Sequence, residues 1–168
     1  IVIKVIRARD VIAADSNGTS DPYCVCTLGK TEQRQKTPVI WKTLNPVWDA
    51  YFEFHVDPNK HKTDALAFTF EVYDKDKFSS DDFLGRVELP LYYVTKFKKS
   101  TTFWYPLESN KINEEVRGEL QLEITAIDDF KIVSPHISAE KKAQLQTAMI
   151  ESFGRASMSS SIGGDYSN

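Results

Sequence analysis

The chain has 168 residues, of which 41% are hydrophobic and 27% charged, and its net charge is −3 at neutral pH. This composition is typical of one globular domain with a short appendage. No apolar run approaches the roughly 20 residues that a membrane-spanning helix needs, and no basic cluster resembles a nucleic-acid footprint. We therefore expect neither a transmembrane helix nor a nucleic-acid partner.

Short segments with the alternation or the β-branched and aromatic content of β-strands recur along the first three quarters of the chain. They are residues 1–7, 23–28, 34–39, 48–56, 66–73, 83–89, 102–107 and 118–127. No long amphipathic helix separates them, although residues 90–99 have room for a helical turn. The pattern predicts an all-β domain, an eight-stranded antiparallel β-sandwich.

The composition changes after Asp129. In residues 138–153, apolar side chains recur every four positions, which predicts a helix with one apolar stripe; these are Leu145, Met149 and Phe153. Residues beyond 156 are rich in Ser and Gly, which is typical of a flexible linker. We therefore expect a β-domain at 1–130 and a C-terminal part at 131–168, with a short helix at about 138–153 and a flexible tail. The stripe could contact a protein partner or pack on the β-domain.

Nothing in the chain indicates catalysis. Its three histidines are scattered, no Ser or Cys lies in a nucleophile motif, and no glycine-rich loop suits a phosphate. Cys24 and Cys26 lack the two further soft ligands that a metal site would need, so we interpret them as buried thiols. The domain is predicted not to be an enzyme.

Aspartates gather at the ends of predicted strands in two groups, which are Asp15 and Asp21, and Asp74, Asp76, Asp81 and Asp82. Carboxylates a few ångströms apart repel one another unless a cation lies between them. A donor set of oxygens alone favours Ca²⁺. Aspartate is also common in ordinary turns, so composition alone leaves open the alternative that these are two unrelated acidic turns. An EF-hand is excluded, because neither loop reaches a glutamate at the twelfth position.

Several motifs occur together, in order, over most of residues 1–130. They are Gly18-Thr-Ser-Asp-Pro-Tyr23, Lys36-Thr37, Thr43-Leu-Asn-Pro-Val-Trp48, Phe52-Glu-Phe54, Val72-Tyr-Asp-Lys-Asp76 and Asp82-Phe-Leu-Gly85. With Asp15 six residues before Asp21, this set resembles the C2 domain, the calcium- and phospholipid-binding module named from protein kinase C. The first strand leads directly into the first aspartate loop, which favours the circularly permuted strand order of that family. A strand missing before residue 1 would give the same pattern.

The resemblance implies a cup of carboxylates that holds two or more Ca²⁺ ions. The expected side-chain ligands are Asp15, Asp21, Asp74, Asp76 and Asp82, joined by the main-chain carbonyls of Ala14 and Lys75. Asp81 is an additional carboxylate, expected in the outer sphere or in solvent.

The function implied by the resemblance is calcium-dependent binding to anionic phospholipid membranes, with phosphatidylserine favoured. The chain would be a cytoplasmic, peripheral membrane-targeting module in signalling or trafficking, recruited by calcium to the cytosolic face of membranes. At the loop tips, Phe78, Lys77 and Asn17 are expected to contact lipid. The alternative is a calcium-independent protein–protein interaction module.

A second basic surface has two interpretations. Tyr23, Arg34 and Lys36, with Lys30 nearby, match the residues that hold phosphoinositides in some C2 domains. Val25 stands where those members carry lysine, and Asp81 adds negative charge, so a solvated face is favoured. The three tryptophans, Trp41, Trp48 and Trp104, are expected to be core or half-buried residues.

Overall fold

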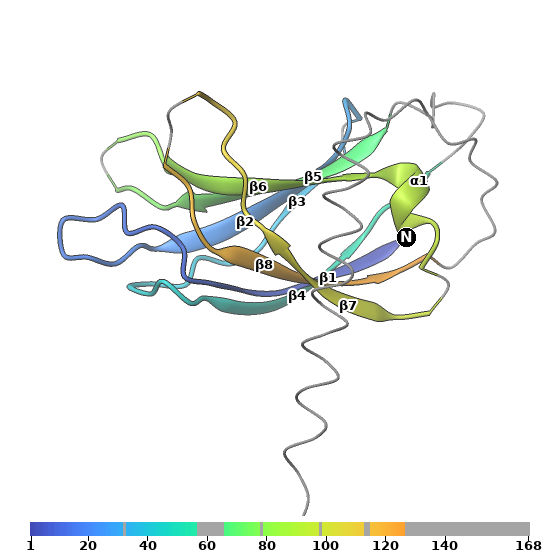
Figure 1. The fold of residues 1–168 in the computed structure, drawn as a ribbon, viewed down its shortest axis with the longest axis horizontal. Helices are drawn as coiled ribbons and strands as arrows, with labels where there is room; N and C mark the ends of the chain where they lie inside the picture. The colour runs from blue at the N-terminus through green and yellow to red at the C-terminus, as the bar shows by residue number, and fades with distance from the viewer. Residues whose placement is uncertain (32, 57–65, 78, 98, 113–114, 127–168) are drawn as a thin grey trace, which may run out of the picture. The chain divides into compact units, whose positions relative to one another are not determined.

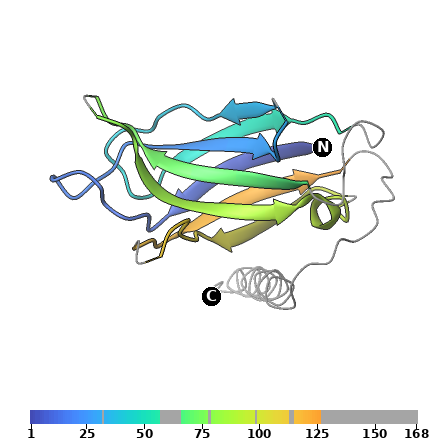
Figure 2. The same cartoon turned by 90° about the horizontal axis from the view of Figure 1, so that it is seen from above.

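The computed structural model of the chain describes residues 1–31, 33–56, 66–77, 79–97, 99–112 and 115–126. The elements are β1 (Val2–Arg9), β2 (Pro22–Leu28), β3 (Arg34–Lys36), β4 (Val47–Glu53), β5 (Ala67–Asp74), β6 (Asp82–Pro90), α1 (Leu91–Val94), β7 (Thr101–Pro106) and β8 (Glu119–Thr125). The strands form two four-stranded antiparallel sheets, in the orders β4-β1-β8-β7 and β3-β2-β5-β6, which make two layers (Figures 1 and 2). The predicted eight-stranded all-β sandwich is confirmed.

The core lies between the two sheets, where alternate residues of each strand point inward. In β5, Phe68, Phe70 and Val72 are fully buried, as the alternation predicted. Phe54, which follows β4, meets the ring of Phe68 edge-to-face with 5.0 Å between centroids. Because burying one such side chain stabilises a fold by roughly 1.5–3 kcal/mol, each of these residues contributes to the cohesion between the layers.

The C-terminal strand of the domain, β8, lies inside a sheet. It pairs with β1 on one side, where Val2 is opposite Thr125, and with β7 on the other side. The last strand of the described chain, β8, therefore lies between β1 and β7 in the sheet. This is the permuted order favoured from the sequence.

Some details differ from the sequence-based expectations. β3 ends at Lys36 rather than at residue 39, because Pro38 has no N–H to continue the ladder. The helical turn expected within residues 90–99 is α1. Both cysteines are buried free thiols, as predicted. The predicted boundary at 130/131, the helix at about 138–153 and the tail lie outside the described residues. No helix among the described residues is long and apolar enough to cross a membrane.

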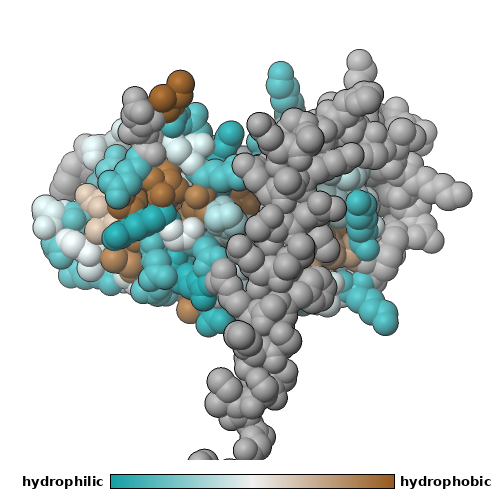
Figure 3. Space-filling view, in the orientation of Figure 1, coloured by the Kyte–Doolittle hydropathy of each residue, from teal (hydrophilic) through white to brown (hydrophobic). Residues whose placement is uncertain are grey.

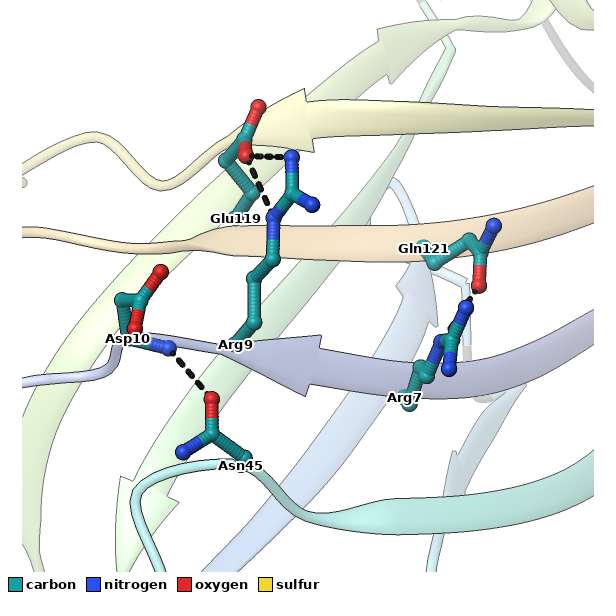
Figure 4. Close-up of polar contacts among 6 residues, drawn as sticks. All are labelled: Arg7, Arg9, Asp10, Asn45, Glu119 and Gln121. Carbon is teal, nitrogen blue, oxygen red and sulfur yellow. Dashed lines mark hydrogen bonds and ion pairs between the residues drawn. The ribbon is translucent and has the colours of Figure 1, made fainter. Parts of the chain in front are cut away.

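One end of the sandwich carries the connections β1–β2, β3–β4, β5–β6 and β7–β8, and we call it the loop end; residue 1 and α1 lie at the opposite end (Figures 1 and 2). The end of β1 is tied to the β3–β4 connection and to the start of β8. The N–H of Asp10 donates to Oδ1 of Asn45 over 3.1 Å, and Nε of Arg9 donates to Glu119 over 2.7 Å (Figure 4). A Cβ at Gly118 would lie 2.5 Å from the carbonyl oxygen of Arg9, so this close approach requires glycine.

Candidate metal centre

Asp74 is the best-enclosed carboxylate at the loop end. It is the last residue of β5, only 2% of its surface is exposed, and its register partner on β2 is Pro22. Its Oδ1 accepts a hydrogen bond from the N–H of Asp21, and the N–H of Lys75 donates to the carbonyl of Asp21 over 3.0 Å. The first and second aspartate groups are therefore joined directly through Asp21 and Asp74.

The electrostatics of Asp74 indicate that other carboxylates surround it. Burial raises the pKa of the Asp74 carboxyl above its ordinary value, against the lowering effect of the Asp21 N–H. The negative charges of Asp15, Asp21 and Asp76 raise this pKa further. A bound cation would relieve the same repulsion, because it favours the ionised form of every carboxylate near it.

A third connection contributes to the position of Asp21. The N–H of Lys42, in the β3–β4 connection, donates to Oδ1 of Asp21 over 2.7 Å. Lys42 has a φ of 56°, in the left-handed region that residues other than glycine rarely adopt. Such strain persists only where the surroundings enforce it. The β3–β4 connection, which holds none of the expected ligands, therefore orients one of them.

The loop that carries Asp15 is built from its own hydrogen bonds. The N–H of Asp15 donates to the carbonyl of Thr19 over 3.1 Å, and the N–H of Gly18 donates to the carbonyl of Asp15 over 3.0 Å. Oδ1 of Asn17 accepts from the N–H and the hydroxyl of Thr19, at 2.8 and 2.6 Å. Asn17, expected to contact lipid, is exposed and also braces this turn.

Ser20 is a residue that the sequence analysis missed. It is fully buried; its hydroxyl donates to the carbonyl of Ile12 and accepts from the N–H of Ala14, both over 3.0 Å. This hydroxyl fixes the backbone at Ala14, whose carbonyl is one of the expected ligands. The motif contains the serine, but a sequence does not show which backbone groups its hydroxyl reaches.

Asp81 is held by the protein itself. Its carboxylate accepts hydrogen bonds from Nζ of Lys75 (2.7 Å), the hydroxyl of Tyr23 (2.6 Å) and the N–H of Asp76 (3.1 Å). Burial tends to raise the pKa of Asp81, but the bonds from Lys75 and Tyr23 outweigh it and the pKa is lowered. Asp81 is thus a half-buried anchor of the β5–β6 connection. Of the two expectations for it, the solvated residue is wrong, and the outer-sphere position stays a prediction.

The expected ligands are not equally enclosed. Asp15, Asp21 and Asp76 are half-buried, whereas Asp82, opposite Asp74 in the β5–β6 register, is exposed. In the part of the chain that the structure describes, no three His, Cys, Asp or Glu side chains converge closely enough to hold an ion as they stand. The donor chemistry nevertheless fits Ca²⁺, since the grouped side chains offer only oxygens around a buried carboxylate.

The predicted lipid-contact residues can be followed only in part. Phe78 lies outside the described residues. Lys77 is exposed, and its ammonium lies 5.8 Å from the centre of the Trp41 ring. Trp41 is 55% exposed, so the expectation of a core or half-buried residue is wrong for it, whereas Trp48 is buried and Trp104 half-buried. Residue 41 belongs to an irregular connection, where alternation cannot predict burial.

The second basic surface has exposed cations on or beside β3. Lys30, Arg34 and Lys36 are all exposed. Tyr23, by contrast, is half-buried, and its hydroxyl already donates to Asp81. Burial, and secondly the bond to Asp81, raise the pKa of Tyr23 to about 12. This arrangement accords with a solvated basic face better than with a phosphoinositide pocket.

Comparison with known proteins gives a consistent result. The family model described as "C2 domain" matches residues 1–107. A probable serine/threonine-protein kinase of Dictyostelium discoideum is 41% identical over 143 residues, which is 84% of this chain and 14% of the relative. The multiple C2 and transmembrane domain-containing protein 1 of Rattus norvegicus is 38% identical over 125 residues, 74% of this chain and 12% of the relative. The chain thus spans only about one seventh of these relatives.

Solved structures are similar too. A C2 domain of a plant extended synaptotagmin 1 superposes with a TM-score of 0.63 at 24% identity, covering 82% of this chain and 95% of that one, which shows the common fold. A calcium-bound structure of two C2 domains of extended synaptotagmin 2 superposes with a TM-score of 0.61 at 28% identity, covering 74% of this chain and 44% of that one.

Proposed function

This chain belongs to the C2 domain family, and we propose that it is a membrane-binding module whose attachment to anionic phospholipids depends on Ca²⁺. The observation that supports this best is the position of Asp74. It is a buried carboxylate, hydrogen-bonded to the N–H of Asp21, with the charges of three other aspartates acting on it. A protein gains little stability from gathering like charges in this way, so a cation ligand accounts for the arrangement.

Five side chains would hold the calcium, two or more ions in all, with the carbonyls of Ala14 and Lys75. They are Asp15, Asp21, Asp74, Asp76 and Asp82. Bound calcium would supply positive charge and coordination positions that lipid phosphate or carboxylate oxygens can fill. The protein's own part is to keep the carboxylates oriented, through the N–H groups of Asp21 and Lys42 and the side chain of Asp81. The calcium-bound state of the extended synaptotagmin 2 structure supports the choice of ion.

Charge explains why calcium would control the membrane. Residues 1–130 carry 17 Lys and Arg against 21 Asp and Glu, a balance of −4. Without calcium the loop end is acidic and would be repelled by an anionic bilayer; two calcium ions would cancel this balance. Calcium and lipid would then raise each other's affinity by the same factor. We propose phosphatidylserine as the preferred lipid and the cytosolic face of membranes as the location.

We further propose that the domain does not itself catalyse a reaction and serves as the membrane-targeting part of a larger or adaptor protein in signalling or trafficking. The chain spans 14% of the Dictyostelium kinase and 12% of the rat protein named for multiple C2 domains. Both names are consistent with one module among several.

The proposal is tested by sedimentation with vesicles across a calcium titration. Phosphatidylserine vesicles should carry the protein down only with calcium, and phosphatidylcholine vesicles should not. Asp74→Asn with Asp76→Asn should abolish the effect. Asp49→Asn is the matched control for each of the two substitutions made singly, because it likewise removes one charge, from a β4 residue that forms an ion pair with Lys4 over 2.8 Å. Absence of binding at millimolar calcium would refute the proposal and leave a calcium-independent protein-interaction module.

A further inference from the structure

Trp41 is the large aromatic residue exposed in the β3–β4 connection at the loop end. It is 55% exposed, whereas Trp48, seven residues later, is buried against the core. An indole left in water costs free energy, since tryptophan has one of the largest apolar surfaces of any side chain. The exposed indole is therefore available at the loop end for an interaction outside the domain.

Hydrogen bonds of the residues on both sides of Trp41 fix the backbone that carries its side chain. The N–H of Ile40 donates to the carbonyl of Pro22 over 3.0 Å, and the N–H of Thr43 donates to the carbonyl of Ser20 over 2.8 Å. Between them, the N–H of Lys42 donates to Oδ1 of Asp21 over 2.7 Å. These bonds fix the backbone on both sides of Trp41 in the conformation in which its indole is exposed.

The surroundings of Trp41 combine an apolar ring with a cation. The ammonium of Lys77, from the β5–β6 connection, lies 5.8 Å from the ring centre. Lys42, next in the chain, is exposed as well. An amphipathic ring flanked by lysines is the combination that settles at the headgroup level of an anionic bilayer. The residue is held by the same segment, 20–22, that supplies Asp21.

The exposed apolar residues of the loop end are dispersed. Ile112, on the separate β7–β8 connection, is 92% exposed. On the face of the molecule drawn in Figure 3, hydrophobic and hydrophilic side chains are interspersed where grey atoms do not cover it. A protein partner usually buries roughly 800 Å² of mixed polar and apolar surface on each side. A fluid lipid interface accepts isolated side chains on separate loops.

We propose that Trp41 is an interfacial anchor: its indole enters the headgroup region of an anionic bilayer while Lys77 pairs with lipid phosphate. This inference rests on the proposed membrane function and adds the β3–β4 connection to the contact surface. The anchor would be positioned before the membrane is met, because its backbone is fixed to residues 20–22 in the protein itself.

The test uses Trp41→Ala in the vesicle assay, with phosphatidylserine vesicles and saturating calcium. The lipid concentration for half-maximal binding should rise by about fivefold to tenfold, because the variant lacks the indole that would be buried in the bilayer. Tyr51→Ala is the matched control. Tyr51 is 67% exposed and also has a lysine over its ring, Lys4 at 5.1 Å, but it lies in the body of β4. The Tyr51→Ala variant should bind phosphatidylserine vesicles like the wild type.

A second readout follows the indole directly. In a Trp104→Phe background the two remaining indoles are Trp41 and the buried Trp48. Quenching of the fluorescence by vesicles with brominated acyl chains therefore reports on Trp41, and it should appear only when calcium is present. Calcium-induced binding of Trp41→Ala at wild-type strength, together with unquenched fluorescence, would overturn this inference while the proposed function stands. Failure of the wild-type protein to bind any vesicle would overturn both. If Trp41 instead contacts a partner protein, Trp41→Ala should bind vesicles at wild-type strength and the fluorescence should stay unquenched.

Discussion

The hydroxyl of Tyr23 donates a 2.6 Å hydrogen bond to the carboxylate of Asp81, which joins strand β2 to the β5–β6 connection. The same carboxylate accepts from Nζ of Lys75 and from the N–H of Asp76. One side chain thus organises the segment that carries two of the expected ligand positions.

Replacing Asp81 should loosen that segment. In Asp81→Asn the ion pair with Lys75 is lost, and we expect a loss of about 1 kcal/mol in the free energy of unfolding. Because groups that orient ligands tune metal affinity, calcium affinity should fall by about tenfold. Calorimetric titration with calcium measures the second effect, and Asp49→Asn controls for the charge. Unchanged calcium affinity would show that Asp81 does not position the site.

The Tyr23 phenol should titrate abnormally. Its pKa is raised from 10.0 to about 12 in the folded protein, first by burial and then by Asp81. A raised pKa means that the neutral phenol stabilises the fold below pH 10, and that this contribution is lost as the pH rises towards 12. The unfolding free energy of Tyr23→Phe should therefore fall less over this interval. NMR of ring-labelled tyrosine gives the pKa itself, and an ordinary value would contradict the prediction.

Asp74→Asn should stabilise the calcium-free protein. The raised pKa of Asp74 means that the ionised carboxylate destabilises the folded state. The free energy of unfolding therefore falls as the pH rises through the pKa of the folded protein. Asparagine removes the charge and keeps an oxygen for the Asp21 N–H. We expect a midpoint of thermal unfolding higher by roughly 2–5 °C at pH 7 with a chelator, and a much smaller increase on adding calcium. A lower midpoint with chelator would be the contrary result.

The Ser20 hydroxyl should matter for stability. Ser20→Ala leaves the carbonyl of Ile12 and the N–H of Ala14 without their buried partner, which costs about 1–3 kcal/mol. Urea unfolding measures this loss. Ser16→Ala, in the same loop but exposed, should change the unfolding free energy little. Equal effects of the two substitutions would argue against a structural role for the Ser20 hydroxyl.

Local pattern was sufficient to predict most of the fold. The alternation of Phe68, Phe70 and Val72 predicts a strand with one buried face, because neighbouring side chains in a strand point to opposite sides. The end of β3 depends on Pro38 and was placed three residues too far. Exact ends of strands depend on which backbone groups find partners, and periodicity does not contain that information.

The sequence predicts which residues form the candidate site better than it predicts the hydrogen bonds that position them. The spacing of Asp15, Asp21, Asp74 and Asp76 indicates a group of carboxylates, and the electrostatics of Asp74 connect these four. The roles of Ser20 and Asp81 depend on partners distant in the chain or on the backbone, which residue types alone do not reveal. Trp41 was expected to be a core or half-buried residue, whereas it is 55% exposed in an irregular connection.

The pairing of β1 with β8 has a consequence for the design of a longer protein. Val2 and Thr125 are neighbours, so the path of the chain enters and leaves the sandwich at the end opposite the loops. A strand of eight residues such as β1 is about 26 Å long at ~3.3 Å per residue. If the loop end binds a membrane as proposed, a domain attached through residue 1 or through the end of β8 would be held about that distance from the lipid surface.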